Sequence, residues 1–241
     1  MFSFVIPVLY EGASINSSIN QLYHQFSGYC FEIIVVDGDP NKSTIQQILS
    51  CNSISSNNFN LKLISAKQGR GSQMNAGANI ADGKILIFLH ADTKMPSDAL
   101  KHIFNVIQKE QYKVGAFKLR FDSQRKIYRF IEFFASLRCR LTLTPYGDQA
   151  IFITKSYFQQ IGKFSEIPIM EDIDLMLRIK KGGEKVYISN KYVKTSSRRW
   201  EKEGVGYCAI RSSILALLFR LGVSPYRLLK YYRVFRNLGA A

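Results

Sequence analysis

His90 and Asp92 stand one residue apart at the end of an apolar run, and their types suggest chemistry. Residues 85–89 are aliphatic except for Phe88, as in a buried strand. Asp37 ends a second apolar run in the same way. Carboxylate oxygens and imidazole nitrogens are both metal ligands. These polar residues therefore either cap the ends of two strands or form the working edge of an active site.

A pair of carboxylates, Glu171 and Asp172, lies in the first turn of a helix predicted over residues 170–183. Acidic residues suit the positive end of a helix dipole, so the pair has a purely structural explanation. A carboxylate held within hydrogen-bond distance of a sugar hydroxyl can also take its proton as a general base. The sequence leaves both interpretations open.

A glycine-flanked arginine, Gly69-Arg70-Gly71, precedes another predicted helix. Glycine lets the backbone approach a ligand closely, and a helix N-terminus favours an anion. The segment matches neither a P-loop nor the GxGxxG pattern of dinucleotide-binding proteins. It is therefore either an anion site or an ordinary turn between a strand and a helix.

Two further segments carry side chains suited to a sugar nucleotide. Asp148 and Gln149 precede a predicted strand, where Asp148 is either a turn residue or an acceptor for a sugar hydroxyl. The run Arg198-Arg199-Trp200 combines guanidinium groups, which clamp a diphosphate bidentately, with an indole, which stacks on a ring. The alternative for this run is a solvated basic loop with one anchored aromatic residue.

The elements that would position these residues alternate along the chain. Apolar density predicts strands at 2–8, 31–37, 61–66, 84–89, 113–121 and 149–155, with 113–121 as a mixed-sheet or edge strand. Helical spacing predicts helices over 14–26, 43–49, 73–81, 97–110, 126–141 and 170–183, with Ser14 and Ser97 as N-caps. This alternation predicts an α/β fold with a mostly parallel central sheet and helices on both faces. Ligands bind at the carboxyl ends of such strands, which brings Asp37 and Asp92 to one edge.

Composition and cysteine usage predict an intracellular, folded chain. The 241 residues are 46% hydrophobic, which suits one large α/β domain with or without a small appendage. The four cysteines are scattered without a zinc-ligand spacing, as in a reduced compartment. The N-terminus reads as a strand and not as a signal peptide. The apolar run at 214–219 is far shorter than the ~20 residues that a membrane span needs, so we expect a cytoplasmic protein.

Positive charge is concentrated toward the C-terminus. The formal net charge is +15, and residues 178–241 hold 15 of the 33 Lys and Arg but three of the 18 acidic residues. This imbalance suggests an anionic partner: phosphates, nucleic acid or a membrane surface. Ser224-Pro225 predicts the start of a helix. Its basic stripe comprises Arg227, Lys230, Arg233 and Arg236, and its apolar side comprises Leu228, Tyr231, Tyr232, Phe235 and Leu238. Such a helix either packs on the domain with solvated charges or contacts the inner face of an anionic membrane.

Taken in order, these segments resemble the family 2 glycosyltransferases of GT-A fold. The similarity covers about residues 1–200 and follows the order VIPVLYE, EIIVVDG, GRGSQMNAG, FLHAD, GDQAIF, MEDIDLMLR and RRW. More narrowly, the chain resembles the branch called rSAM/selenodomain-associated transferase family 2. The resemblance implies a Rossmann-like GT-A domain over residues 1–204, followed by basic amphipathic helices over 205–241.

The resemblance also implies which residues bind a nucleotide-sugar donor. Pro7, Glu11 and Asp37 would lie around its nucleoside, with Arg70 near the same nucleotide. Arg198, Arg199 and Trp200 resemble the end of the QxxRW motif, although Ser196 stands in place of its Gln. The remaining donor-binding candidates are Asp148 and Gln149.

Metal and catalytic roles follow from two further motif positions. Asp92 matches the last Asp of the metal-binding DxD motif, which implies Mn²⁺ or Mg²⁺ held by Asp92 and His90. His90 is itself a departure, because the motif has its first Asp there. Asp172 matches the catalytic base, with Glu171 supporting it.

The expected function is metal-dependent, inverting transfer of a sugar from a nucleotide-diphosphate sugar to an acceptor hydroxyl. The acceptor is not identified by the sequence, and a lipid-linked acceptor is one candidate. A nucleotidyltransferase of similar sheet architecture is one alternative, although the glycine-rich loop expected after its first strand is replaced by LYEGAS. A non-catalytic nucleic-acid-binding domain is the other. It explains the charge but not the converging carboxylates, so no nucleic-acid partner is expected.

Overall fold

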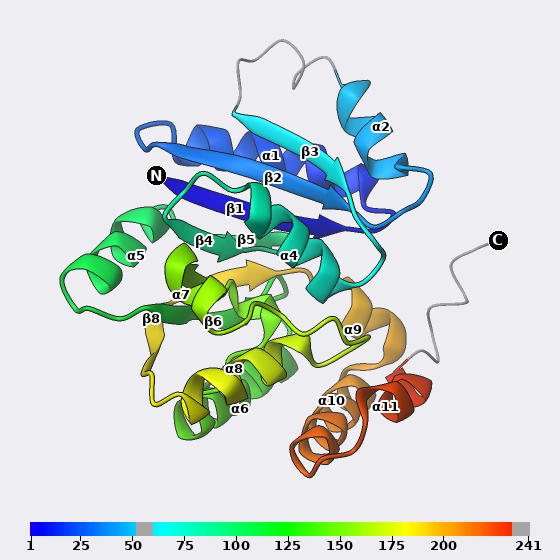
Figure 1. Cartoon of the computed structure of the whole chain (residues 1–241). Coiled ribbons are helices and arrows are strands. Elements are labelled where there is room, and N and C mark those ends of the chain that lie inside the picture. Colours follow the sequence, from blue (N-terminus) through cyan, green and yellow to red (C-terminus); the bar gives the residue numbers. More distant parts are fainter. Residues whose placement is uncertain (52–59, 233–241) are drawn as a thin grey trace.

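The computed structural model describes residues 1–51 and 60–232, and its framework is one twisted sheet (Figure 1). Within these residues, eight strands pair in the order β3-β2-β1-β4-β7-β6-β8-β5. The strands are β1 (Phe2–Val8), β2 (Phe31–Asp37), β3 (Leu61–Ser65), β4 (Ile85–Phe88), β5 (Thr93–Lys94), β6 (Val114–Phe121), β7 (Phe152–Thr154) and β8 (Val186–Thr195). Neighbours among β1 to β4 are parallel, as are β6 and β8, whereas β7 is antiparallel to both its neighbours and β5 to β8. The carboxyl ends of β1, β2, β4 and β6 therefore lie at the same edge.

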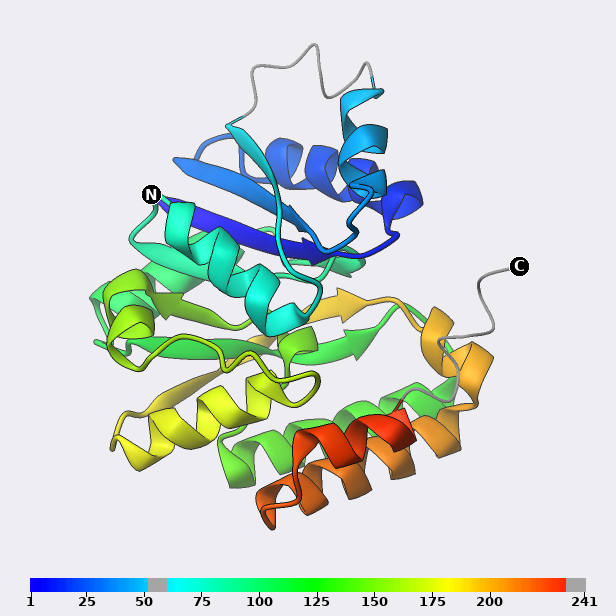
Figure 2. The ribbon, with the colours of Figure 1, turned by 45° about the vertical axis from the view of Figure 1, so that its right-hand side comes forward.

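Helices cover both faces of this sheet (Figures 1 and 2). The helices are α1 (Gly12–Gln25), α2 (Ser43–Leu49), α4 (Arg70–Ile80), α5 (Ala99–Gln108), α6 (Lys126–Thr142), α7 (Lys155–Gln160), α8 (Glu171–Lys181), α9 (Arg198–Glu203), α10 (Val205–Arg220) and α11 (Pro225–Tyr232), with a 3-10 turn, η1, at Gly147–Gln149. Helices α1 and α5 contribute to one hydrophobic core, and α4, α7 and α8 contribute to the core on the other face. The predicted α/β fold with a mostly parallel sheet is confirmed.

Burial on both faces explains why the central strands can be predicted from the sequence. In β1, Phe4 and Ile6 belong to one core, and Val5 between them belongs to the other. Parallel strands covered on both faces are apolar throughout, without alternation. The strands predicted at 2–8 and 31–37 are confirmed at both ends.

The predicted helix N-caps are wrong for α1 and α5. The N-cap of α1 is Glu11, because the N–H groups of Ser14 and the next residue already bond to the Glu11 carbonyl. Ser14 therefore lies within the first turn, where its hydroxyl donates to the Glu11 carboxylate at 3.1 Å. The N-cap of α5 is Asp98 and not Ser97. Helix α4 also begins earlier than predicted, at Arg70.

The second half of the sheet differs most from the prediction. Strand β8 was not predicted, because Lys191 and Lys194 interrupt its apolar residues and only part of it is buried. Strand β6 lies inside the sheet, between β7 and β8, and is not an edge strand. Strand β7 begins at Phe152, three residues after the predicted start, because residues 147–149 form the 3-10 turn.

The C-terminal helices pack on the α/β domain. Val205 at the start of α10 and Ile131 of α6 pack against the same cluster of Leu119, Phe121 and Tyr128, and Leu215 and Leu228 cluster with Ile169 before α8. Leu228, on the predicted apolar side of α11, is only 1% exposed. No helix in residues 1–51 and 60–232 combines the length and the apolar character needed to cross a membrane.

The predicted basic stripe falls partly on this C-terminal segment. Arg227 and Lys230 are exposed on α11. The rest of the predicted stripe and apolar side lies outside the described residues; it comprises Arg233, Phe235, Arg236 and Leu238.

Candidate active site

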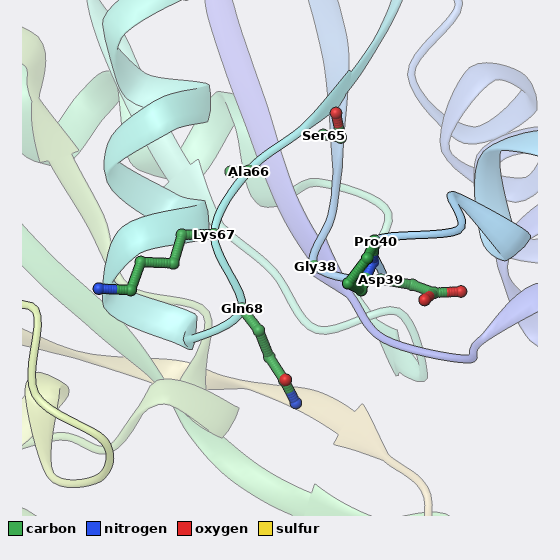
Figure 3. Close-up of a pocket in the computed structure, with 7 residues that line it drawn as sticks. All are labelled: Gly38, Asp39, Pro40, Ser65, Ala66, Lys67 and Gln68. Carbon is green, nitrogen blue, oxygen red and sulfur yellow. The ribbon is translucent and has the colours of Figure 1, made fainter.

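A pocket of about 480 Å³ opens at the carboxyl ends of β2 and β3 (Figure 3). Its lining comes from the loop after β2 and the connection from β3 to α4, namely Gly38, Asp39, Pro40, Ser65, Ala66, Lys67 and Gln68. Below it, the buried Gln73 amide donates to two carbonyls at the ends of β1 and β2, each at 2.8 Å. A Cβ on Gly38 would lie 2.8 Å from the Gln73 side chain, so the floor of the pocket has no room for one. The volume is in the range of small-molecule sites.

Asp37 supports the loop beside this pocket and has no exposed surface. Its Oδ1 accepts the N–H of Asp39 at 2.9 Å. Its Oδ2 accepts the N–H groups of Thr44 at 3.0 Å and Ile45 at 3.2 Å, in the first turn of α2. These contacts match the alternative in which Asp37 is a cap. A role of Asp37 toward a nucleoside stays a prediction.

Pro7 and Glu11 lie at the adjacent strand. Pro7 is partly exposed and pairs in register with Val36 of β2. Glu11 ties the start of α1 to α2, because its N–H donates to the Thr44 hydroxyl at 3.3 Å. Both residues therefore border the edge at which the pocket opens.

A second set of polar side chains converges beside η1. The N–H of Gly147 donates to Oδ2 of Asp172 at 2.6 Å. A Cβ on Gly147 would lie 3.5 Å from that oxygen and 3.3 Å from Nε2 of His90. The missing side chain at Gly147 therefore leaves a gap bounded by the imidazole of His90 and the carboxylate of Asp172.

Arg70, at the start of α4, lies near the same group of residues. Although burial lowers its pKa, the charges of Tyr232, Glu171, Asp172 and Asp148 act in the opposite direction and raise it above its ordinary value. Within the part of the chain that the structure describes, no side chain forms a hydrogen bond or ion pair with its guanidinium. Arg70 is thus available to an anionic ligand.

The carboxylates of this group lie near one another, and both burial and their mutual repulsion raise the pKa of Asp148 and Glu171. Burial, followed by the charge of Asp172, raises the pKa of Asp148 to about 6, against the opposing effect of Arg138 and Arg70. Burial and Asp172 also raise the pKa of Glu171, which is 5% exposed. A bound cation would relieve this repulsion.

His90 and Asp92 were predicted to hold a metal ion. Burial and the charge of Arg70 lower the pKa of His90 to about 3, so its imidazole is neutral and has a nitrogen free to ligate. Burial raises the pKa of Asp92, whereas Arg198, Arg70 and a hydrogen bond with Thr195 lower it. Across residues 1–51 and 60–232, no three His, Cys, Asp or Glu side chains are grouped to hold a metal together. One carboxylate and one imidazole fit an ion such as Mg²⁺ or Mn²⁺ that takes its other ligands from a diphosphate.

The sequence of the chain decides its family. A family model described as "Glycosyl transferase family 2" matches residues 3–167. The chain belongs to the glycosyl transferase family 2. A search of curated proteins finds no match. The narrower resemblance to the rSAM/selenodomain-associated branch stays a prediction.

Solved structures share the fold of this family 2 chain at low sequence identity. The mannosyltransferase PcManGT from Pyrobaculum calidifontis, in complex with GDP-Man and Mn²⁺, has a TM-score of 0.69 and 15% identity, over 97% of this chain and 70% of its own. Glucosyl-3-phosphoglycerate synthase from Mycobacterium tuberculosis, in complex with Mn²⁺, UDP and glucosyl-3-phosphoglycerate, has a TM-score of 0.63 and 16% identity. The match covers 92% of this chain and 80% of the synthase chain. TarS 1-349 from S. aureus, in complex with UDP-GlcNAc, has a TM-score of 0.62 and 18% identity over 81% of this chain. The match spans 58% of that TarS chain.

The three residues of the Arg-Arg-Trp run have different neighbours. Arg198 is exposed and its charge acts on Asp92. Arg199 donates to the Tyr232 hydroxyl at 2.7 Å and to a carboxylate of α9. Trp200 packs edge-on against Phe121, with ring centroids 5.0 Å apart. Of the three, Arg198 is therefore the one whose side chain faces the metal-binding candidates.

Gln149 lies inside the protein and shapes η1. It is 2% exposed, and its amide nitrogen donates to the Phe117 carbonyl at 2.8 Å. Its amide oxygen accepts the N–H of Tyr146 at 3.0 Å. Gln149 therefore fixes the turn that carries Gly147 and Asp148.

Tyr232 is a site neighbour that sequence reasoning assigned to a different role. Burial raises its pKa, but Arg70 and Arg199 outweigh burial and lower it. The Arg199 guanidinium also lies over its ring, 4.7 Å from the centroid. The end of α11 thus reaches back to the active-site edge. Nothing in the local sequence indicates this, because it depends on how α10 and α11 pack.

Proposed function

We propose that this chain transfers a sugar from a nucleotide-diphosphate sugar to an acceptor hydroxyl, with inversion and with a divalent metal ion. The observation that carries the proposal is the hydrogen bond from Gly147 that holds Asp172, with Arg70 nearby and its guanidinium without a hydrogen bond or ion pair to the described residues. This placement lies at the strand edge where the pocket opens, in a family 2 chain. Its solved neighbours are complexes with GDP-Man, UDP or UDP-GlcNAc, two of them with Mn²⁺. Family membership favours this reaction over nucleotidyl transfer and over nucleic-acid binding.

The donor would bind across the strand edge. Its nucleoside fits the pocket over residues 38–40 and 65–68, beside Pro7 and Glu11. Its diphosphate would then lie within reach of Arg70 and Arg198. Asp92 and His90 would hold Mn²⁺ or Mg²⁺, which when bound neutralises charge on a diphosphate leaving group.

Asp172 acts on the acceptor. Its carboxylate takes the proton of the acceptor hydroxyl, whose oxygen bonds to the anomeric carbon as the bond from that carbon to the diphosphate breaks. The leaving diphosphate keeps the electron pair, and Arg70 meets its charge. The N–H of Gly147 fixes the orientation of Asp172 before the acceptor arrives. Glu171, raised in pKa beside Asp172, supports this charge arrangement and is not the base.

A lipid-linked acceptor suits the surroundings of the site. Arg138 of α6 lies over the ring of Tyr146, 3.6 Å from its centroid, and Tyr146 directly precedes Gly147. The acceptor side of the active site therefore adjoins α6, whose outer face is apolar. A soluble acceptor is the alternative.

A donor screen tests the proposal. Thermal unfolding would be followed with UDP-, GDP- and other nucleotide-sugars, each with and without Mn²⁺, because a ligand of the folded state raises apparent stability. We expect at least one nucleotide-sugar to stabilise the chain more with Mn²⁺ than without. Release of the matching nucleoside diphosphate would then be measured. No stabilisation by any nucleotide-sugar, combined with pyrophosphate release from a nucleoside triphosphate, would favour the nucleotidyltransferase alternative.

A further inference from the structure

A second pocket, of about 350 Å³, lies between α6 and strands β6 and β8. Four of its lining side chains are cationic, namely Lys118, Arg120, Arg129 and Arg140. Glu132 is the one carboxylate that lines it. None of its lining residues belongs to the first pocket or to the donor and catalytic candidates.

The positive charge in the pocket is only partly balanced. Glu132 pairs with Arg129 at 3.0 Å, whereas Arg120 lies 3.9 Å from it. Lys118 is 7% exposed and donates to the neutral amide of Asn190 at 3.2 Å. Burial and the nearby Arg140 lower the pKa of Lys118. An anion in the pocket would relieve both effects.

The geometry of these cations suits a phosphate group. The ring of Tyr192 lies under Lys118 and Arg120, with the charged groups 5.5 Å and 4.8 Å from its centroid. Cation–π contacts of this kind hold the two side chains side by side. Arginine and lysine together can satisfy the several acceptor oxygens of one phosphate.

The pocket opens beside an exposed apolar face on α6. Phe133 and Leu137 line the pocket, yet they are 63% and 41% exposed. The same face includes Phe130, Phe134 and Leu141, at 61%, 49% and 77% exposure. The three phenylalanines alone present on the order of 300 Å² to solvent. Adding the leucines exceeds the few hundred Å² of contiguous apolar surface that soluble monomers usually show.

Helix α10 carries a matching apolar face. Ile210, Ile214, Leu217 and Leu221, at helical spacing, are between 51% and 72% exposed. Helices α6 and α10 lie close together at the lower end of the molecule in Figures 1 and 2, and Ile131 of α6 and Val205 of α10 pack against the same cluster of Leu119, Phe121 and Tyr128. We call these exposed residues of α6 and α10 the α6–α10 face.

The charges that helices α6, α10 and α11 expose are of one sign. Helices α10 and α11 contain no Asp or Glu, and the single acidic residue of α6 is the buried Glu132. Exposed cations border the face at Lys126, Arg140, Arg227 and Lys230. A second copy of the chain would bring the same charges into contact. An anionic lipid surface complements both the charges and the apolar residues.

We infer that the α6–α10 face docks on an anionic membrane, with the phosphate of a lipid headgroup in the cationic pocket beside α6. The apolar side chains enter the boundary between headgroups and acyl chains. The cations around them meet the negative surface. This places the apolar part of the membrane contact on α6 and α10, with Arg227 and Lys230 of the predicted stripe among the cations that border it. The docking does not depend on the proposed sugar transfer.

Vesicle co-sedimentation tests the inference with the full chain. The vesicles would contain phosphatidylcholine alone, or phosphatidylcholine with phosphatidylglycerol, at low and high salt. We expect the protein to sediment with the anionic vesicles at low salt and to be released at high salt. Arg120→Gln with Arg140→Gln should lower the partition coefficient on anionic vesicles by roughly tenfold or more. Phe133→Ser with Leu217→Ser should lower binding to both kinds of vesicle.

Matched controls come from α5, which packs elsewhere on the sheet (Figure 1). Phe104→Ser removes a phenylalanine that is 49% exposed, and Lys101→Gln with Lys109→Gln removes two exposed cations. Both should bind vesicles like the wild type. Unchanged thermal unfolding of all variants would show that they are folded. Donor binding, measured in parallel without vesicles, reports separately on the proposed function.

Three outcomes would overturn the inference. The first is wild-type protein that stays in the supernatant with anionic vesicles at low salt. The second is stabilisation by inorganic phosphate that depends on Arg120 and Arg140 without vesicle binding, which would make the pocket a site for a soluble phosphate. The third is a dimer in light scattering that Phe133→Ser dissociates, which would make the face a subunit interface.

Discussion

The backbone N–H of Gly147 donates a 2.6 Å hydrogen bond to Oδ2 of Asp172. The two residues are 25 positions apart, on η1 and at the start of α8. The bond orients Asp172 on one side of the gap that Gly147 leaves. His90 borders the same gap. Catalysis by a base depends on such orientation, because proton transfer requires hydrogen-bond geometry.

Gly147→Ala should slow sugar transfer strongly while leaving the fold intact. The added methyl would lie 3.3 Å from Nε2 of His90 and 3.5 Å from Oδ2 of Asp172, and would fill the gap between them. We expect a loss of about tenfold or more in kcat, since small displacements of a catalytic group are costly. Gly28→Ala is the control, because a Cβ there meets nothing within 4 Å. Equal rates for the two variants would show that the gap is not used.

Asp172→Asn should remove the general base and leave donor binding intact. The amide keeps the shape of the carboxylate and cannot accept a proton, so we expect kcat to fall by about 10²-fold or more. The Kd of the nucleotide should change little. Asp122→Asn, at an exposed aspartate, is the matched control. Loss of transfer in Glu171→Gln together with normal transfer in Asp172→Asn would reverse the two roles.

Asp92→Asn should remove the metal-dependent part of nucleotide binding. Titration calorimetry with and without Mn²⁺ would measure the Kd of the nucleoside diphosphate. We expect the difference between the two conditions to disappear in the variant, because an amide oxygen is a weaker ligand for a hard cation. His90→Ala should have a smaller effect, since imidazole is not a preferred ligand of Mg²⁺. A variant with an unchanged Mn²⁺ dependence would exclude Asp92 as the main ligand.

Asp148→Asn should stabilise the protein, and only at higher pH. The folded state raises the pKa of this carboxyl from 3.8 to about 6, chiefly by burial. The folded chain therefore binds the proton more tightly than the unfolded chain does, and stability falls as pH rises through about 6. Above that pH the free energy of unfolding of the variant should be higher by about 1 kcal/mol, after allowance for solvent screening. Thermal unfolding at several pH values would measure this difference. Below the ordinary pKa the two proteins should be alike. A difference that is constant with pH would contradict this origin.

Glu32→Gln should destabilise the sheet without touching the active site. The Glu32 carboxylate is fully buried and accepts the Ser3 hydroxyl at 2.6 Å and the Gly83 N–H at 3.2 Å, and it pairs with Lys62 at 2.7 Å. Burial raises its pKa, but these contacts outweigh burial and lower it, so its contribution is present at neutral pH and lost as pH falls through the lowered value. We expect a loss of about 3 kcal/mol in the free energy of unfolding at neutral pH. Denaturant unfolding would measure it.

Asp82→Asn is the control for that measurement, because the Asp82 side chain is 66% exposed and shares the same lysine. Its effect should be within about 1 kcal/mol, as for exposed ion pairs. Transfer activity per folded molecule should be unchanged in both variants. A large effect in the control and none in Glu32→Gln would place the stabilising contact at the surface.

The sequence by itself determined the apolar framework and the ends of its central strands. Strands β1 and β2 are recognisable in the sequence because they are buried on both faces, so most residues along them are apolar. The ordered motifs determined the family, which the match over residues 3–167 establishes. The same reasoning located the segments that carry Arg70, His90, Asp148 and Asp172, because each follows a strand, precedes a strand or opens a helix.

Only the tertiary structure decided what those side chains contact. In the sequence, Asp37 and Asp92 each lie at or just after the end of an apolar run. In the structure, Asp37 accepts hydrogen bonds from three backbone N–H groups, whereas Asp92 lies near the charge of Arg198. Trp200 packs against Phe121, and Tyr232 returns to Arg70. These relationships join residues far apart in the chain, so local spacing carries no record of them. They arise from how the sheet twists and from where α10 and α11 pack, which depends on the whole core at once.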